Sequence, residues 1–184
     1  GEDQKQHVEL ARDLAERFNN KYSETFKVPE PLIKKEGARI MSLQNPDKKM
    51  SKSDGNENGY ILILDDPDTT RRKVKRAVTD SIGEVKYNDE QVGIKNLINI
   101  YSVFSGASIG EIENKYAGQG YGKFKEDVAE VVIEGLAPIQ KRYKELINNK
   151  DYLEKVYREG RDRAEYKAMK TLRKVYKKVG FIQR

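Results

Sequence analysis

Apolar side chains recur at three- and four-residue steps along most of the chain, which is the spacing of one face of an α-helix. The first such stripe predicts a helix that ends near Tyr22, with charged residues on its opposite side. Asp13 and Arg17 stand four positions apart on that side, a separation at which opposite charges support a helix. The stripe itself consists of Val8, Ala11, Leu14, Ala15, Phe18 and Tyr22.

The middle of the chain contains a clear helix start. Asp66, Pro67 and Asp68 combine an N-cap, a proline at the first helical position and an acid in the first turn, so a helix is predicted from there to about Val78. Five of the six residues over 71–76 are basic, which makes one face of this helix strongly positive. A solvated face is the ordinary explanation, and contact with a nucleic acid is the alternative.

The second half of the chain predicts helices joined by short loops. Ser108 and Glu111 have the spacing of a capping box, which starts a short helix to about Tyr116. From Thr79 onward no segment predicts a strand, so this part is expected to form a small helical bundle. The other helices are expected over 93–105, 123–148 with a kink at Pro138, and 151–179 with Gly180 as C-cap.

Two short apolar runs interrupt the helical pattern. Residues 38–43 predict a short strand that leads directly into a lysine- and serine-rich stretch. Residues 60–64 fit either a strand or a buried turn of helix, because periodicity does not separate the two in so short a run. The predicted fold class is therefore mainly α, with one helix and a short strand followed by an all-helical bundle.

Composition and charge narrow the classes of protein that remain. Hydrophobic and charged residues each make up 36% of the 184 residues, a profile that suits packed helices better than a buried parallel sheet. The absence of cysteine excludes disulfides and thiolate metal sites. No apolar run is long enough to cross a membrane, so no membrane-spanning helix is expected.

The charge is unevenly distributed along the chain. Residues 139–184 hold 15 basic and 6 acidic groups, a net charge of +9, whereas residues 1–138 carry a net charge of −3. This asymmetry fits either a polyanionic partner or a solubilising helix.

The stretch from Asp47 to Asp54 carries the candidate chemistry. Three lysines and two serines lie between turn-forming residues, in the order Asp-Lys-Lys-Met-Ser-Lys-Ser-Asp. Lysine supplies a compact positive charge on a flexible stem and serine a hydroxyl donor, so a loop of this kind can close over a polyanion and neutralise charge that develops on it. A solvated basic loop is the competing interpretation.

The order Lys-Met-Ser-Lys-Ser resembles the signature loop of class I aminoacyl-tRNA synthetases. The segment Gly-Glu-Asp-Gln-Lys-Gln-His at the start of the chain, together with Gly-Ala-Arg-Ile-Met-Ser-Leu over 37–43, is similar to the bacterial tryptophanyl-tRNA synthetases. The tyrosyl enzymes, the alternative, have a differently composed Asp-Gln segment at this place. The resemblance covers essentially the whole chain and is strongest over 1–20 and 37–54.

The resemblance implies a two-part organisation. In this family a Rossmann-type catalytic domain is followed by a helical domain that contacts the tRNA anticodon. On that mapping, residues 1–60 are the last part of the catalytic domain, including the loop at 47–54, and residues 61–184 are the helical tRNA anticodon-binding domain. The first helix and short strand would then be a remnant of the Rossmann-type α/β fold.

The resemblance also implies a reaction, that of a tryptophan–tRNA ligase. The carboxylate of L-tryptophan attacks the α-phosphate of ATP, accompanied by Mg²⁺, and the activated aminoacyl group passes to tRNA(Trp). Lys49 and Lys52 would be catalytic by stabilising charge on the departing pyrophosphate, and Gln4 falls where the family approaches tryptophan. No residue is expected to bind a metal directly. The positions that match ATP contacts are Gly1, Glu2, Asp3, Ile40, Lys49, Met50, Ser51, Lys52 and Ser53.

Several parts of the family pattern are absent. The first signature, a His-Ile-Gly-His-type loop, is not in this sequence, and neither are the residues that bind the indole ring. We therefore expect a C-terminal fragment that is inactive alone and monomeric, from a cytoplasmic enzyme that is a homodimer at full length. The competing interpretation is a synthetase-derived RNA-binding module that uses the basic helices from residue 139 and has lost catalysis.

Overall fold

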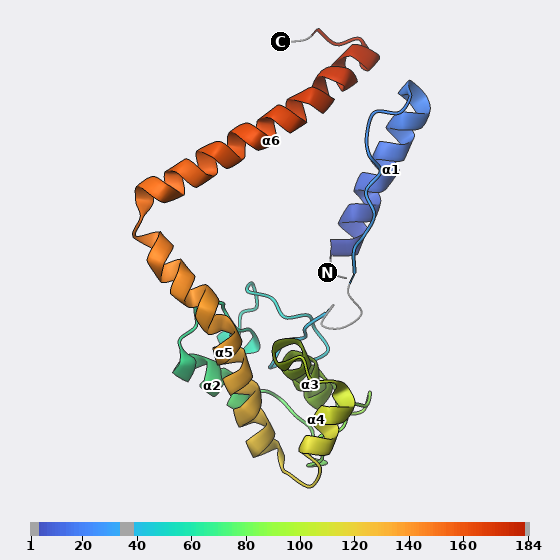
Figure 1. The fold of residues 1–184 in the computed structure, drawn as a ribbon. Helices are drawn as coiled ribbons and strands as arrows, with labels where there is room; N and C mark the ends of the chain where they lie inside the picture. The colour runs from blue at the N-terminus through green and yellow to red at the C-terminus, as the bar shows by residue number, and fades with distance from the viewer. Residues whose placement is uncertain (1–3, 34–38, 183–184) are drawn as a thin grey trace. The chain divides into compact units, whose positions relative to one another are not determined.

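The computed structural model describes residues 4–33 and 39–182 (Figure 1). Within these ranges the chain forms six α-helices and one 3₁₀ turn, and no strand. None of the described helices is long and apolar enough to cross a membrane. The elements are α1 (Lys5–Tyr22), η2 (Glu57–Gly59), α2 (Pro67–Lys75), α3 (Val92–Ser105), α4 (Ile109–Lys115), α5 (Tyr121–Ile147) and α6 (Lys150–Val179).

The contacts divide the chain into two compact units. Unit 1 comprises residues 1–33 and 144–184, and so holds α1 and α6. Unit 2 comprises residues 34–143 and holds α2, α3, α4 and most of α5. This grouping does not coincide with the division at residue 60 that the family resemblance implies.

The predicted helix boundaries are mostly confirmed, and their caps explain why. The Asp66 side chain accepts a hydrogen bond from the backbone N–H of Thr69 at 2.9 Å, so α2 begins as expected. It ends at Lys75, earlier than predicted, because the N–H of Val78 donates instead to the carbonyl of Leu43 at 2.7 Å. The capping box of Ser108 and Glu111 is present. Helix α5 continues through Pro138 to Ile147.

The two predicted apolar runs are where the structure departs from the sequence prediction. Of the strand predicted over 38–43, residues 39–43 are described, and they form only a single antiparallel bridge, between Met41 and Lys49. The prediction for residues 60–64, either a strand or a buried turn of helix, is also wrong. These residues form an extended segment and a turn that the carboxylate of Asp65 closes on the N–H of Leu62, at 2.9 Å. Leu62, Ile63 and Leu64 are exposed.

Unit 2 is built around one hydrophobic core. Helices α2, α3, α4 and the first part of α5 lie close together (Figure 1), and their side chains form this core with Leu43 of the extended segment. Tyr101, Tyr116 and Phe124 pack their rings against one another, with centroids 4.9–6.2 Å apart. The fully buried members with the largest side chains are Tyr116, Phe124, Leu43, Ile94, Leu97, Ile98 and Ile112.

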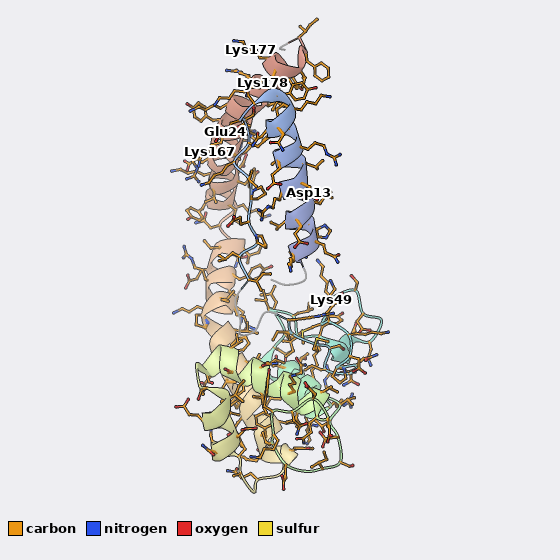
Figure 2. All side chains as sticks on the ribbon, turned by 90° about the vertical axis from the view of Figure 1, so that its right-hand side faces the viewer. Asp13, Glu24, Lys49, Lys167, Lys177 and Lys178 are labelled. Carbon is orange, nitrogen blue, oxygen red and sulfur yellow. The ribbon has the colours of Figure 1, made fainter. Side chains whose placement is uncertain are left out.

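Unit 1 joins α1 and α6 with little burial. After α1 the chain doubles back along the helix (Figure 1). The side chain of Asn19 holds it there by accepting from the N–H groups of Thr25 and Phe26 at 2.9 Å. The ammonium of Lys178 on α6 donates to the hydroxyl of Ser23 at 2.7 Å and to the carbonyl of Glu24 at 3.0 Å (Figure 2). Lys178 therefore ties the end of α6 to the turn that follows α1.

Candidate functional site

The lysine loop is held by the short extended segment that precedes it. Met41 lies in this segment, and both of its backbone groups bond to one side chain on α3. The N–H of Met41 donates to Oδ1 of Asn96 at 2.9 Å, and Nδ2 of Asn96 donates to the carbonyl of Met41 at 2.8 Å. Asn96 is only 2% exposed, so these two bonds form inside the core of unit 2. A side chain thus takes the place of a neighbouring strand.

The opposite edge of the same segment bonds to the loop. The N–H of Met50 donates to the carbonyl of Ile40 at 2.9 Å, and the N–H of Ser42 donates to the carbonyl of Lys48 at 2.8 Å. These bonds flank the bridge between Met41 and Lys49. Successive residues of an extended chain present their backbone groups to opposite sides, so the segment bonds to α3 with Met41 and to the loop with its neighbours.

A close contact fixes the far end of the loop. The N–H of Leu43 donates to the carbonyl of Gly59 at 2.9 Å, which brings the 3₁₀ turn η2 against the extended segment. A β-carbon on Gly59 would lie 2.8 Å from Oγ of Ser42 and 2.9 Å from Oδ2 of Asp54. Ser42 is fully buried, and its oxygen also accepts from the N–H groups of Gln44 and Asn45 at 3.3 Å. Glycine at position 59 is therefore a steric requirement for this closure.

Within the loop, one residue points inward and the cations point outward. Met50 is half-buried and packs against the core, where it helps to line an apolar cavity of about 220 Å³ with Ile100, Val132 and Leu136. Lys49 and Lys52 are exposed (Lys49 is labelled in Figure 2), and so is Ser53. The N–H of Asp54 donates to the carbonyl of Ser51 at 3.1 Å, which turns the chain after the second lysine.

The two loop lysines have no ion-pair partner among the described residues, unlike the paired cations Arg71 and Lys73 of α2. Over 4–33 and 39–182, neither Lys49 nor Lys52 lies within salt-bridge distance of a carboxylate. By contrast, Lys73 on α2 is buried with Asp65, with Nζ and Oδ2 2.6 Å apart, and Nε of Arg71 lies 2.6 Å from Oε1 of Glu130. The loop therefore presents two lysines without an ion-pair partner from a base held by backbone hydrogen bonds, an arrangement suited to binding phosphate groups.

A second group of cations lines a cleft of about 490 Å³ between α2 and α5. Arg72, Lys75 and Lys125 line it together with Glu126 and the ion pair of Arg71 and Glu130. The ammonium of Lys125 donates to the carbonyl of Ala77 at 2.8 Å and to the hydroxyl of Thr79 at 3.1 Å. Burial lowers the pKa of Lys125. Helix α2 was predicted to have a strongly positive face. Of that face, Arg72 and Lys75 are exposed to solvent and line this cleft.

The structure brings together part of the predicted site. Ile40 and the loop residues Lys49 to Ser53 are neighbours through the bond between Ile40 and Met50. Gln4 is the N-cap residue of α1 in unit 1, and its side chain makes no capping hydrogen bond. Gly1, Glu2 and Asp3 lie outside the described residues. No group of three or more His, Cys, Asp or Glu side chains that could hold a metal ion occurs among the residues described.

Sequence reasoning missed the residues that hold the loop. Asn96 interrupts the apolar face of α3 between Ile94 and Leu97, and a polar residue at such a position signals a buried hydrogen bond. That signal was available, although its partner was not, because Met41 lies 55 positions away. Ser42 and Gly59 gave no signal of their own, since their roles depend on a contact that only the folded chain creates.

Comparison with known proteins finds similarity along the whole chain. The profile of the tRNA synthetases class I (W and Y) matches residues 1–137. A tryptophan–tRNA ligase from Clostridium perfringens is 56% identical over 184 residues, which is 100% of this chain and 55% of that protein. One from Clostridium tetani is 59% identical over 182 residues, covering 99% of this chain and 54% of the relative. The chain therefore spans about half the length of the curated relatives it matches.

Solved structures agree with these matches. A tryptophanyl-tRNA synthetase from Mycoplasma pneumoniae superposes with a TM-score of 0.87 at 29% identity, covering 99% of this chain and 55% of that one. A second, from Campylobacter jejuni, is described as complexed with ADP and tryptophan. It has a TM-score of 0.65 and 32% identity, and covers 98% of this chain and 56% of its own.

Proposed function

The chain belongs to the class I tRNA synthetases of the tryptophan and tyrosine type, and from this premise we propose that it is the C-terminal part of a tryptophan–tRNA ligase. The full-length enzyme would activate L-tryptophan with ATP and transfer it to tRNA(Trp). Tryptophan is favoured over tyrosine because the relatives of 56% and 59% identity are both tryptophan–tRNA ligases. The observation that carries the proposal is the rigidly based loop with two unpaired lysines, Lys49 and Lys52.

The chemistry assigned to the loop follows from charge. When the tryptophan carboxylate attacks the α-phosphate, negative charge develops on the departing pyrophosphate. Lys49 and Lys52 would stabilise that charge, and Ser51 and Ser53 would donate hydroxyl hydrogen bonds to phosphate oxygens. Mg²⁺ would arrive bound to the phosphates of ATP, since this ion is commonly held by substrate oxygens and water. Met50 would hold the loop against the hydrophobic core, on which its side chain packs.

The remaining assignments extend this proposal to the rest of the chain. Gly1, Glu2, Asp3 and Ile40 would complete the ATP site and Gln4 would approach tryptophan. Residues 1–60 would belong to the catalytic domain and residues 61–184 to the helical domain that binds tRNA. The basic cleft between α2 and α5 and the basic helices after residue 139 are both candidates for that contact. The full-length enzyme would be a cytoplasmic homodimer.

Tryptophan-dependent exchange of pyrophosphate into ATP by the full-length enzyme tests the proposal. We expect exchange with tryptophan and none with tyrosine. Lys52→Ala should lower the exchange rate about 100-fold while leaving tryptophan binding unchanged, because the lysine acts on charge that forms only as pyrophosphate departs. Lys48→Ala removes the same charge from the same loop at a position outside the proposed site, and serves as the matched control.

The opposite results have defined meanings. A Lys52→Ala rate within twofold of wild type would remove this lysine from the mechanism. Wild-type enzyme that exchanges with neither amino acid, and still binds tRNA, would favour the competing function, an RNA-binding module that kept the loop and lost catalysis.

A further inference from the structure

The amide of Asn96 is the one side chain of the core of unit 2 that bonds to both backbone groups of Met41. We propose that Asn96 is a positioning residue for the lysine loop, through the bridge between Met41 and Lys49. This inference rests on the proposed function, since the loop is where that function places the phosphate chemistry. Asn96 itself faces the backbone of Met41 and lies in the core.

The bonds form a continuous path from the helix to the catalytic loop. Asn96 holds Met41 from one side at 2.8 and 2.9 Å. On the other side, Ser42 and Met50 make the two bonds that join this segment to the loop, at 2.8 and 2.9 Å. Leu43 of the segment bonds to Gly59 and Val78, whereas the bonds from the described segment to α3 are the two made by Asn96. The directional bonds of this carboxamide therefore set the depth and register of the segment against α3.

Met50 is a second attachment of the loop, but of a different kind. Its side chain packs on the core and lines the apolar cavity. A methionine side chain is flexible and adapts to several packings, so it can hold the loop near the core without fixing its register. A carboxamide, by contrast, donates and accepts in one plane and at defined distances. The position of Lys49 therefore depends on Asn96 more than on Met50.

Asn96→Asp is the decisive variant because it changes one donor and almost no volume. The ionised carboxylate still accepts from the N–H of Met41, but it sets a second acceptor against the Met41 carbonyl. The protonated carboxylic acid has both a donor and an acceptor, as the amide has. Burial raises the pKa of a carboxyl group, so protonation should begin above the ordinary value of about 3.9. The defect should therefore recover as pH falls.

The measurement is tryptophan-dependent pyrophosphate exchange by the full-length enzyme over the range from about pH 8 to pH 5. At the alkaline end we expect Asn96→Asp to lower kcat about 10- to 100-fold, with the KM for tryptophan unchanged. The ratio of its rate to that of wild type should rise as pH falls. Asn99→Asp is the matched control: it makes the same change three residues on in α3, where no hydrogen bond to the segment is present.

A second readout uses the 184-residue chain and does not depend on activity. Amide hydrogen exchange at Ser42 and Met50 reports the two bonds that hold the loop. Their protection should fall in Asn96→Asp relative to wild type at neutral pH and recover on acidification. Asn96→Ser removes both bonds without adding a charge, so its loss of hydrogen-exchange protection at Ser42 and Met50 should be independent of pH. It also stands in if the aspartate variant does not fold.

The outcomes separate this inference from the proposed function. Asn96→Asp or Asn96→Ser with kcat and protection within twofold of Asn99→Asp would overturn the positioning role and leave the ligase assignment intact. A fall in kcat that only matches the loss of folded protein, and that does not recover as pH falls, would make Asn96 merely structural. Wild-type enzyme without exchange would refute the proposed function, and protection alone would then decide whether Asn96 holds the loop.

Discussion

Units 1 and 2 contain helices with similar apolar stripes but very different burial. In unit 2, α3 buries most of its apolar residues and the first part of α5 buries five side chains, and Ile94, Phe124 and Val128 are all 0% exposed. In unit 1, Ala15 is the only buried residue among those described, and α6 buries none of its 30 residues. Val156 and Tyr157, two of the large apolar side chains of α6, are 45% and 63% exposed.

The difference shows what a helical stripe does and does not establish. A period of 3.6 residues predicts that one face can be covered, and α1, α3, α5 and α6 are all helices as that period predicts. Whether the face is covered depends on a partner surface. Within unit 2 the helices supply that surface to one another, and the extended segment with the lysine loop is built onto it. The candidate site therefore rests on the better-packed unit.

The buried ion pair of unit 2 provides the largest expected effect. Asp65→Asn should reduce the free energy of unfolding of unit 2 by about 3–5 kcal/mol, because the Lys73 ammonium, only 5% exposed, would lose its counter-charge. The ring of Tyr60, 5.1 Å from that ammonium, is too weak a partner to replace a carboxylate. Urea unfolding followed by hydrogen exchange in each unit measures this, and unit 1 should be unaffected.

Asp68→Asn is the matched control for that substitution. It makes the same change one turn away, at an ion pair with Arg71 in which Asp68 is 94% exposed. Exposed pairs contribute little, so the loss should stay below about 1 kcal/mol. Equal losses for the two variants would show that burial does not distinguish these pairs and would weaken the contrast between a core and a surface of unit 2.

A matched pair of truncations compares the two units directly. Val128→Ala in α5 should cost about 2 kcal/mol, because Val128 is fully buried, whereas Val156→Ala in α6 should cost less than about 0.5 kcal/mol. Urea unfolding of each variant, monitored by hydrogen exchange in the unit that carries it, gives both values. A loss at Val156 as large as that at Val128 would mean that α6 is covered in solution and that the contrast between the units does not hold.

Local signals predicted most of the fold. Two helices start at the N-caps Asp66 and Ser108, and two end at the C-cap glycines Gly106 and Gly180. Each of these caps depends on residues within a few positions of one another. The lysine loop was identified in the same way, from a run of residues between turn formers. What these elements share is that their hydrogen-bond partners are close in sequence.

The predictions that were wrong depend on distant partners. The segment over 38–43 has the composition of a strand, but its neighbours are a carboxamide on α3, two groups of the loop and the carbonyl of Gly59, so no ladder forms. Likewise, α2 was predicted to reach Val78, and it stops at Lys75 because the Val78 N–H bonds to Leu43. Positive charge over 71–76 did not reveal that Lys73 is buried and Arg71 is paired.

The smallest predicted effect concerns acid and sharpens the contrast between the units. In unit 2 the carboxylate of Asp80 accepts from the hydroxyl of Tyr121 at 2.5 Å and from the N–H of Ile82 at 2.8 Å. Desolvation raises the pKa of Asp80, but these bonds, with a further one from Gln91, outweigh it, so the net pKa lies below the ordinary value. Tyr121 belongs to α5, so the interaction ties the loop after α2 to that helix.

The sign of the pH effect follows from that lowered pKa. A carboxyl group whose folded pKa is depressed stabilises the folded state at pH values above its unfolded pKa, about 3.9, and this contribution is lost as pH falls through the folded pKa. Unit 2 should therefore lose about 1 kcal/mol or less of its unfolding free energy through Asp80 below about pH 4.

The side chain in the variant Asp80→Asn is neutral at every pH, so the unfolding free energy of this variant should depend less on pH between about 5 and 2.5 than that of wild type. Urea unfolding across that range measures the slope, with Asp13→Asn in α1 of unit 1 as the control. If the two variants show the same slope, the bond from Tyr121 does not stabilise the carboxylate, and the acid response of unit 2 comes from elsewhere in its core.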